Sequence, residues 1–569
     1  MKYEWKGVKY MKDSIQRKKK SRRFFLVFYF LVVIAICYAW TQEGKRLNRD
    51  QLVEDTRQLA SIIESAHPDP YINGGGKIAF HRRLQEILAA IPAEGMGIPE
   101  YYKILRPFIA GIQDAHTNIW LPSSGGNSSL GLPIGFEAID NRVIVARVYS
   151  EEHKPILGAV ITGVEGVAFT ELISRQKRLK PFENEYGNLN NVMSSLGQRK
   201  SLEDLLPECR GKDQITVTLR LPDGTSHEKS ISLIDKLPSQ RITAPTKIAV
   251  PNFDKSDPVY GFLDTEGKVA ILRFGNMMGY REAMEYLASV ADSETVTNWA
   301  NYNYERFNKK KSPKGLKETI AGIPSATETF ASLVAEMKKA GTEMLLLDVR
   351  GNPGGNSFIT DILIYFLFGW EIRDSACNTV TISKFSELFF TNYEQRTIED
   401  FGKYYAFPLM IGDYAFPEYG IGDQAEEETL GRYATFAAEK KSGAYEAYFR
   451  PKNIVVLISS KTFSSAYWFA ADLMKAGAML VGTPSGQAGN SFGDVLSFTL
   501  KNSGLMGGVS YRQFLKFPDD SFKGRLLRPD FELTYEKLRS YNFDPNAEII
   551  WALELFSNQK EGFSTMILE

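Results

Sequence analysis

Three short segments of the chain combine residue types that can do chemistry. The first, residues 347–356 (LDVRGNPGGN), ends an apolar run in Asp348 and Arg350 and opens into a turn with three glycines. Such a turn can direct backbone N–H groups at an anion. It is not a phosphate loop, because no Gly-Lys-Ser/Thr follows. A tight strand-to-helix turn without any chemistry is the simpler alternative.

The second segment, residues 458–470 (ISSKTFSSAYWFA), takes an apolar strand through a serine-rich turn into a helix with an apolar face. Ser464 at such a helix start is most commonly an N-cap. It can equally be a nucleophile, because a helix N-terminus stabilises developing negative charge and supplies N–H donors to an oxyanion. Lys461 is an alternative base, although on this turn we expect it to face solvent. The segment alone leaves capping and catalysis open.

The third segment, residues 113–117 (QDAHT), contains one of the five histidines of the chain. His116 lies between apolar segments, and Asp114 is close enough in sequence to orient its ring. A lone histidine is more often structural than catalytic. The other four lie in a proline-containing break of the helical pattern, on a predicted helix face, or in runs expected to be exposed: His67, His81, His153 and His227. His116 is therefore the candidate general base.

The elements that must position these segments change character along the chain. Residues 46–130 place apolar residues at three- and four-residue spacing, which predicts a helical N-terminal module. Residues 131–240 read as short strands and turns with a hairpin signal, and they resemble a degenerate PDZ domain. From residue 241 to residue 569, buried-strand runs alternate with helical stretches, which predicts an α/β core. We expect the polar segment 278–323 to be a surface insertion.

Composition narrows the function class. The 569 residues are 43% hydrophobic, which excludes a disordered chain, and 68 Lys+Arg balance 68 Asp+Glu, which argues against a nucleic-acid-binding protein. The three cysteines cannot build a disulfide scaffold. No cluster of His, Cys and carboxylates has metal-ligand spacing, so we expect neither a metal nor another cofactor. The sequence does not determine the oligomeric state.

The N-terminus has a different charge from the rest of the chain. Residues 1–23 carry ten Lys/Arg against two acidic residues, and the next 17 residues are uncharged. As a helix these would span about 26 Å, close to the thickness of a bilayer core. No small-x-small cleavage site follows Trp40, so residues 24–41 are predicted to be an uncleaved signal anchor. The positive-inside rule then makes residues 1–23 a cytoplasmic tail and exports the remainder of this single-pass chain.

Together, the three motifs and the order of elements over residues 52–555 resemble the tail-specific (C-terminal processing) serine peptidase family. The family motif L-D-x-R-x-N-x-G-G matches residues 347–355, and T-x-S-x-A/S-E matches residues 462–467 with Ser464 as nucleophile. Tyr467 replaces the final glutamate. The resemblance implies a ClpP/crotonase-like core for residues 241–569. It also implies an oxyanion hole from the backbones of Ser465 and of Gly354 or Gly355.

The base and the third catalytic residue depart from the commonest family pattern. Residues 483–493 lack the lysine of members with a Ser-Lys dyad. A branch related to tricorn-like and retinoid-binding-protein-like members instead carries D-x-H-T, which matches residues 114–117 and implies His116 as base for Ser464. No carboxylate precedes Pro529 where tricorn-like members place one. Asp494 and Asp114 remain as candidates for the third member.

These observations predict a membrane-anchored, extracytoplasmic serine endopeptidase. It would bind protein or peptide substrates and cleave tails or unfolded segments through an acyl-enzyme on Ser464. The alternative is a catalytically inactive peptide- or lipid-binding protein on the same scaffold.

Overall fold

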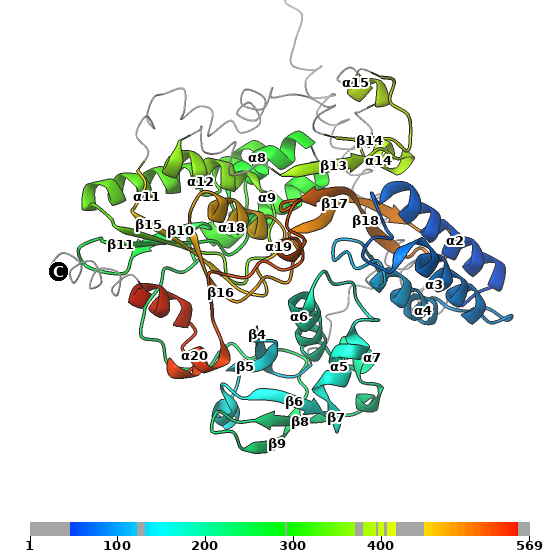
Figure 1. Ribbon diagram of the computed structural model, residues 1–569, viewed down its shortest axis with the longest axis horizontal. Helices are drawn as coiled ribbons and strands as arrows, with labels where there is room; N and C mark the ends of the chain where they lie inside the picture. The colour runs from blue at the N-terminus through cyan, green and yellow to red at the C-terminus, as the bar shows by residue number, and fades with distance from the viewer. Residues whose placement is uncertain are drawn as a thin grey trace, which may run out of the picture.

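The computed structural model describes residues 46–121, 131–290, 293–369, 379–393, 397–402, 405, 407–416 and 449–555. They form three units, which Figure 1 shows in blue, in cyan, and in green to red. We call them the helical unit (residues 46–121), the middle unit (residues 131–242) and the core unit (residues 259–555).

The helical unit packs three helices against the core unit. Its elements are β1 (Arg46–Leu47), α2 (Arg49–Ala66), α3 (Gly76–Ala90), β2 (Met96–Gly97), α4 (Ile98–Ala110) and β3 (Asn118–Trp120). Asn48 and Gln51 exchange hydrogen bonds in a capping box that starts α2. The apolar faces of the helices share one buried cluster with the strands β17 (Asn490–Thr499) and β18 (Met506–Leu515) of the core unit.

The middle unit is an antiparallel sheet of order β4-β5-β6-β8-β9, with β7 paired to β6. β4 and β9 are its two edge strands. Helices α5 to α7 pack on the sheet in one buried cluster, to which Leu526 of the core unit also contributes. The elements are β4 (Ile134–Ile139), β5 (Arg142–Val148), η1 (Glu151–Ile156), β6 (Val160–Val164), β7 (Val167–Ala168), α5 (Phe169–Gln176), α6 (Glu185–Leu196), α7 (Arg199–Leu205), η2 (Pro207–Cys209), β8 (Gln214–Arg220) and β9 (Ser226–Ser232).

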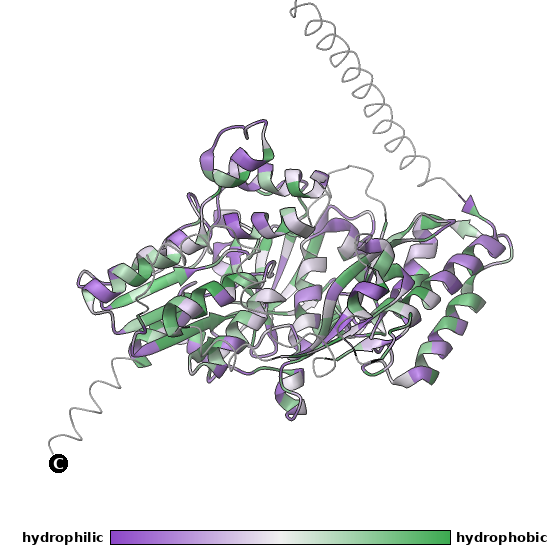
Figure 2. Cartoon of the chain, turned by 90° about the horizontal axis from the view of Figure 1, so that it is seen from above, coloured by the Kyte–Doolittle hydropathy of each residue, from purple (hydrophilic) through white to green (hydrophobic). Residues whose placement is uncertain are grey.

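The core unit contains the α/β sheet that the sequence predicts. Its order is β10-β11-β12-β15-β16-β19, in which only β10 is antiparallel to its neighbour. The strands are β10 (Val259–Phe262), β11 (Val269–Arg273), β12 (Met344–Asp348), β15 (Asn453–Ile458), β16 (Met479–Gly482) and β19 (Phe531–Glu532). Apolar clusters cover both faces of the sheet, which explains why the central strands are apolar along their length. Figure 2 shows these strands in green, whereas the outer helices mix green and purple.

Helices surround this sheet, and a second sheet links it to the helical unit. The helices are α8 (Arg281–Val290), α9 (Ser293–Asn308), α10 (Leu316–Ala321), α11 (Ala326–Ala340), α12 (Phe358–Phe368), α14 (Glu387–Asn392), α15 (Ile398–Gly402), α18 (Ser465–Lys475), α19 (Ser521–Arg525), α20 (Tyr535–Ser540) and a helix over residues 547–555. The second sheet has the order β14-β13-β18-β17, with β13 (Val380–Lys384) and β14 (Tyr414–Ala415), and β3 of the helical unit pairs with β18.

Segment 278–323 is not a surface insertion, because it forms α8 to α10 and contributes buried Tyr280, Met284 and Ile323 to the main cluster of the core unit. The predicted anchor, residues 24–41, lies outside the described residues. Among the helices that the structure describes, none has the length and apolar character needed to cross a membrane.

Candidate active site

Ser464 stands at a sharp turn between β15 and α18. Its backbone has φ 53° and ψ −127°, a region that residues other than glycine rarely adopt. Such strain persists where the surroundings impose it, and it clusters at active sites. The Ser464 side chain makes no capping hydrogen bond to α18. The N-cap interpretation is therefore wrong, and the hydroxyl is left for another role.

Bonds from three directions impose this backbone geometry. The Phe463 N–H donates to the Asn352 carbonyl at 3.0 Å, and Thr462 Oγ1 donates to the Val349 carbonyl at 2.9 Å. On the other side, the Ser464 N–H donates to Gln487 Oε1. The nucleophile turn is thus held between the end of β12 and the loop 485–488.

The glycine-rich turn after β12 lies directly against Ser464. Gly354 has φ 95°, and a Cβ there would lie 2.7 Å from Ser464 Cβ and 2.8 Å from the Ser465 nitrogen. The Gly354 N–H donates to Asn352 Oδ1 at 2.8 Å, so Gly355 is the glycine whose amide can be offered to a ligand. Ser465 is the first residue of α18, and an amide in this position has no acceptor within the helix. Gly355 and Ser465 therefore best suit the predicted oxyanion hole.

The two charged residues of the same motif have a structural role. Arg350 Nε donates to Asp348 Oδ1 at 2.9 Å, and its Nη1 reaches Glu548 Oε2 at 2.5 Å and the Pro545 carbonyl at 3.1 Å. These bonds attach the end of β12 to the C-terminal helix over residues 547–555. Neither charge is directed at Ser464.

The pairing of β3 with β18 places His116 near the nucleophile, although the two residues are far apart in sequence. Asn118 pairs with Gly508, which fixes the chain just after His116. The imidazole stacks on Phe463, with ring centroids 5.0 Å apart and planes at 25°, and Phe463 immediately precedes Ser464. Both His116 and Ser464 line one cavity of about 670 Å³, together with Gly355 and Ser465. The structure thus brings the predicted base, nucleophile and oxyanion donors to one place.

Asp114, a candidate third member, is fully buried and its two oxygens are already engaged. Oδ2 accepts from Ser510 Oγ at 2.7 Å and from Thr117 Oγ1 at 2.5 Å, and it lies 3.2 Å from His67 Nε2. Oδ1 accepts the His116 backbone N–H at 2.9 Å and lies 3.8 Å from the ring Nδ1. Asp114 therefore shapes the loop that carries His116.

Asp494, the other candidate, lines the cavity but pairs with a different residue. Arg512 Nη1 donates to Asp494 Oδ2 at 2.7 Å, and both side chains are partly exposed. No hydrogen bond between Asp494 and His116 exists among the described residues. The geometry does not favour Asp494 as the residue that orients the imidazole.

A carboxylate that the sequence did not single out lies closer to the ring. Glu183 Oε1 is 3.6 Å from His116 Nδ1, and the Glu183 side chain is buried. Within the described residues, both atoms lack a hydrogen-bond partner. Glu183 belongs to the middle unit, just before α6. Its neighbour Asn184 caps α6, a local signal that marks a helix start but gives no hint of chemistry.

The charges around His116 favour its protonated form. Burial would lower the pKa of the imidazole, but Glu183, Asp114 and Asp494 outweigh burial and raise it above its usual value. Burial also raises the pKa of Glu183, against the opposing effect of His116. The pKa of Asp114 is held well below its usual range, because the bond and charge of His67 and the charge of His116 overcome its burial.

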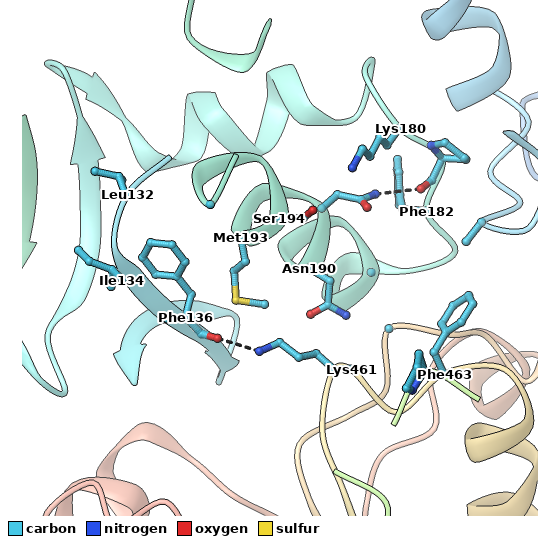
Figure 3. A pocket seen from close by; sticks show the side chains of 18 of the residues that line it. Leu132, Ile134, Phe136, Lys180, Phe182, Asn190, Met193, Ser194, Lys461 and Phe463 are labelled. Atoms are coloured by element: carbon cyan, nitrogen blue, oxygen red, sulfur yellow. Dashed lines mark hydrogen bonds between the residues drawn. The ribbon is translucent and has the colours of Figure 1, made fainter. Parts of the chain in front are cut away.

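The sequence predicts that Lys461 faces solvent, but the structure places its side chain against the middle unit. Its Nζ lies 2.8 Å from the Phe136 carbonyl and 2.8 Å from Glu137 Oε1, both on β4 of the middle unit. Figure 3 shows its side chain directed away from Phe463 and toward Phe136. Lys461 thus links the nucleophile turn to the middle unit, and its ion pair does not suit a neutral base.

The fold also assembles a set of groups that sequence spacing did not reveal. Asp114, His116 and Glu183 each present a potential metal-ligand atom, all within 4.8 Å of one another. One imidazole and two carboxylates could hold a divalent cation. They equally form the base and carboxylates of a hydrolytic site, and the stacking of His116 on Phe463 beside Ser464 favours that role.

Comparison with known proteins finds a match to one family model and to several solved structures. Residues 304–533 match the model of peptidase family S41, a range that includes the glycine-rich turn and Ser464 but neither His116 nor Glu183. No curated protein matches the sequence. The crystal structure of mature CPAF is similar over 89% of this chain and 98% of its own, with 16% identity and a TM-score of 0.52. A serine-to-alanine mutant of CPAF is similar over 88% of this chain and 96% of its own, with 14% identity and a TM-score of 0.53.

The similarity to CPAF establishes the overall fold, since identity at this level carries no more than that. The family match covers the motif residues themselves. With the strained serine, the glycine turn packed against it and a histidine in the same cavity, the match over residues 304–533 supports peptidase family S41, the tail-specific proteases, and a serine-type peptidase.

Proposed function

We propose that this serine-type peptidase is a membrane-anchored, extracytoplasmic endopeptidase that cleaves protein tails or unfolded segments. The observation that carries the proposal is the cavity that Ser464 and His116 share with Gly355 and Ser465. Each role of an acyl-transfer site, namely nucleophile, base and oxyanion donors, is represented there.

The geometry supports a two-step acyl transfer. His116 takes the proton of Ser464 Oγ as that oxygen attacks the peptide carbonyl carbon, and the Gly355 and Ser465 N–H groups stabilise the oxyanion. His116 then gives the proton to the leaving amine as the C–N bond breaks. In the second step His116 removes a proton from water as the water oxygen attacks the acyl carbon. The ester C–O bond to Ser464 then breaks, His116 returns the proton to Ser464 Oγ, and the acid is released.

The shape of the site favours extended substrates. Ser464 lies in a cavity lined by residues of the core unit and by His116 of the helical unit, so a peptide bond must enter this cavity to reach the hydroxyl. A chain end or an unfolded segment could enter it. This is why we infer tails and unfolded segments as the substrate class.

We further propose that the middle unit is PDZ-like and binds part of the same peptide. Its edge strand β4 faces α6 across a cavity of about 600 Å³, lined by Ile134 and Phe136 on the strand and Met193 on the helix (Figure 3). An edge strand beside a cavity with apolar side chains can accept an extended peptide by strand addition. Phe463 lines this cavity too, so the bound peptide would lie close to the nucleophile turn.

Replacement of the nucleophile tests the catalytic part of the proposal. Ser464→Ala should abolish hydrolysis of an unstructured fluorogenic peptide and prevent labelling by a fluorophosphonate. Ser540→Ala, a change at an exposed serine on α20, is the matched control and should retain both. Unchanged hydrolysis in Ser464→Ala would refute the mechanism. A wild-type protein that neither hydrolyses nor labels would support the binding-protein alternative.

The location is a separate proposal, and it rests on the basic segment 1–23 followed by the apolar segment 24–41. The full chain should remain in the membrane fraction after carbonate extraction and be released by detergent. A chain beginning at residue 42 should be soluble. Protease added outside intact cells or spheroplasts should digest the core unit. Protection of the core unit until the membrane is permeabilised would contradict the proposed orientation.

A further inference from the structure

Two buried atoms near the catalytic centre face each other without a hydrogen-bond partner among the described residues. They are His116 Nδ1 and Glu183 Oε1, 3.6 Å apart. A buried polar atom without a partner carries a cost of about 1–3 kcal/mol, so such a pair needs an explanation. A small rotation of either side chain would join these two atoms in a charge-assisted hydrogen bond and remove the cost for both.

We propose that Glu183 is the carboxylate that positions His116, and that the middle unit therefore supplies the third member of the catalytic site. This inference rests on the proposed roles of Ser464 and His116. With Nδ1–H directed at Glu183, the imidazole presents Nε2 as the proton acceptor, which is the tautomer that a general base for serine needs. The other two carboxylates near the ring are engaged elsewhere, Asp114 by its loop and Asp494 by Arg512.

Glu183 is held in place by the same loop that holds the nucleophile. Its Oε2 accepts the Ala488 N–H at 2.8 Å. Next to it, Asn184 Nδ2 donates to the carbonyls of Ser485 and Gln487, each at 3.1 Å. Gln487 in turn accepts the Ser464 N–H through its side chain, and Ser485 Oγ donates to the Thr462 carbonyl at 2.5 Å.

The loop 485–488 thus connects the middle unit to the core unit beside the candidate active site. Gln487 of this loop binds the backbone of Ser464, and Ala488 binds the carboxylate of Glu183, which lies beside His116. Because Glu183 belongs to the middle unit, the geometry of the base depends on how that unit is docked on the core unit. A displacement of the middle unit would separate Glu183 from His116 while leaving the oxyanion donors in place.

The test compares Glu183→Gln with Glu183→Asp and with Glu185→Gln, an exposed position two residues further on. Glu183→Gln should lower kcat by up to about 10⁴-fold with little change in KM, the loss that neutralising an orienting carboxylate causes in a serine-peptidase triad. Its acid limb in kcat/KM should move to lower pH, because burial without the opposing charge lowers the pKa of His116. Glu183→Asp keeps the charge, so its acid limb should stay near that of wild type. Glu185→Gln should match wild type in kcat and in the acid limb of kcat/KM.

A second measurement does not depend on turnover. Titration of the His116 ring by NMR should give a lower pKa in Glu183→Gln than in wild type, and circular dichroism at each pH checks that the variant is folded. An unchanged His116 pKa together with an unchanged kcat would overturn the proposal. If Ser464→Ala abolishes hydrolysis while Glu183→Gln leaves both kcat and the His116 pKa unchanged, this inference fails and the proposed function stands. If hydrolysis persists in Ser464→Ala, the proposed function fails instead.

A bound divalent cation is the competing explanation for His116 Nδ1 and Glu183 Oε1 having no hydrogen-bond partner among the described residues. The same hydrolysis assay distinguishes the two explanations. A positioning carboxylate predicts that EDTA leaves kcat unchanged. Activity that EDTA removes and Zn²⁺ restores would overturn the proposal, because His116 Nδ1 and Glu183 would then be metal ligands.

Discussion

The close approach of Gly354 to Ser464 allows a prediction in which backbone strain and displacement of the nucleophile can be separated. Gly354→Ala places a methyl group 2.7 Å from Ser464 Cβ and the Phe463 carbonyl oxygen, whereas ordinary contacts begin at 3.4 Å. The nucleophile turn must therefore move by about 0.7 Å. The glycine turn cannot easily move instead, since its Gly354 carbonyl accepts the Met277 N–H and its Gly354 N–H donates to Asn352.

The chain offers a matched control in the same turn. Gly351 also has a positive φ, 71°, but a Cβ there would have no atom within 4 Å. Alanine at either position therefore adds left-handed backbone strain of about 1–2 kcal/mol, and only Gly354→Ala adds a collision. We expect both variants to lose about 1–2 kcal/mol of unfolding free energy, with a further loss in Gly354→Ala.

The activities should differ much more than the stabilities. A displacement approaching 1 Å in a catalytic group costs up to about 10²-fold in rate. We therefore expect kcat to fall on the order of 10²-fold in Gly354→Ala and to stay within about twofold of wild type in Gly351→Ala. Steady-state hydrolysis of an unstructured peptide and urea unfolding at the same pH measure the two quantities. Equal losses of kcat in the two variants would refute the argument that close packing against Ser464 controls its position.

Two further predictions concern charged residues near the site. Lys461→Met should leave kcat within severalfold of wild type. It should lower the free energy of unfolding by at most about 1 kcal/mol in urea titrations, because the Lys461 and Glu137 side chains are 32% and 38% exposed. Loss of all hydrolysis would instead support Lys461 as base. The folded-state pKa of Asp114 lies below its unfolded value, so its stabilising contribution is present at neutral pH and is lost as pH falls below about 4 toward the folded value. Asp114→Asn should accordingly lower the unfolding free energy by about 3 kcal/mol at pH 7 and by less at pH 3, as urea titrations would measure, and an equal loss at both pH values would contradict this role.

The local motifs were predictable because each is contained in one contiguous segment. The helix expected after the serine-rich turn is α18, which begins at the residue after Ser464. The central strands were predictable because burial on both faces requires apolar residues throughout. The segment 278–323 was misjudged, since its many polar residues conceal widely spaced apolar ones that three helices gather on their buried faces.

The sequence indicated the serine-peptidase class and proposed Ser464 and His116 as nucleophile and base, because the motifs that carry the family resemblance are each encoded by neighbouring residues. Which carboxylate lies beside His116 depends on tertiary packing. Glu183 follows no motif, and it reaches His116 only because the middle unit is fastened to the loop 485–488, while β3 holds His116 on β18. Contacts of this kind join segments hundreds of residues apart, and their geometry follows from how whole units pack, which no local pattern records.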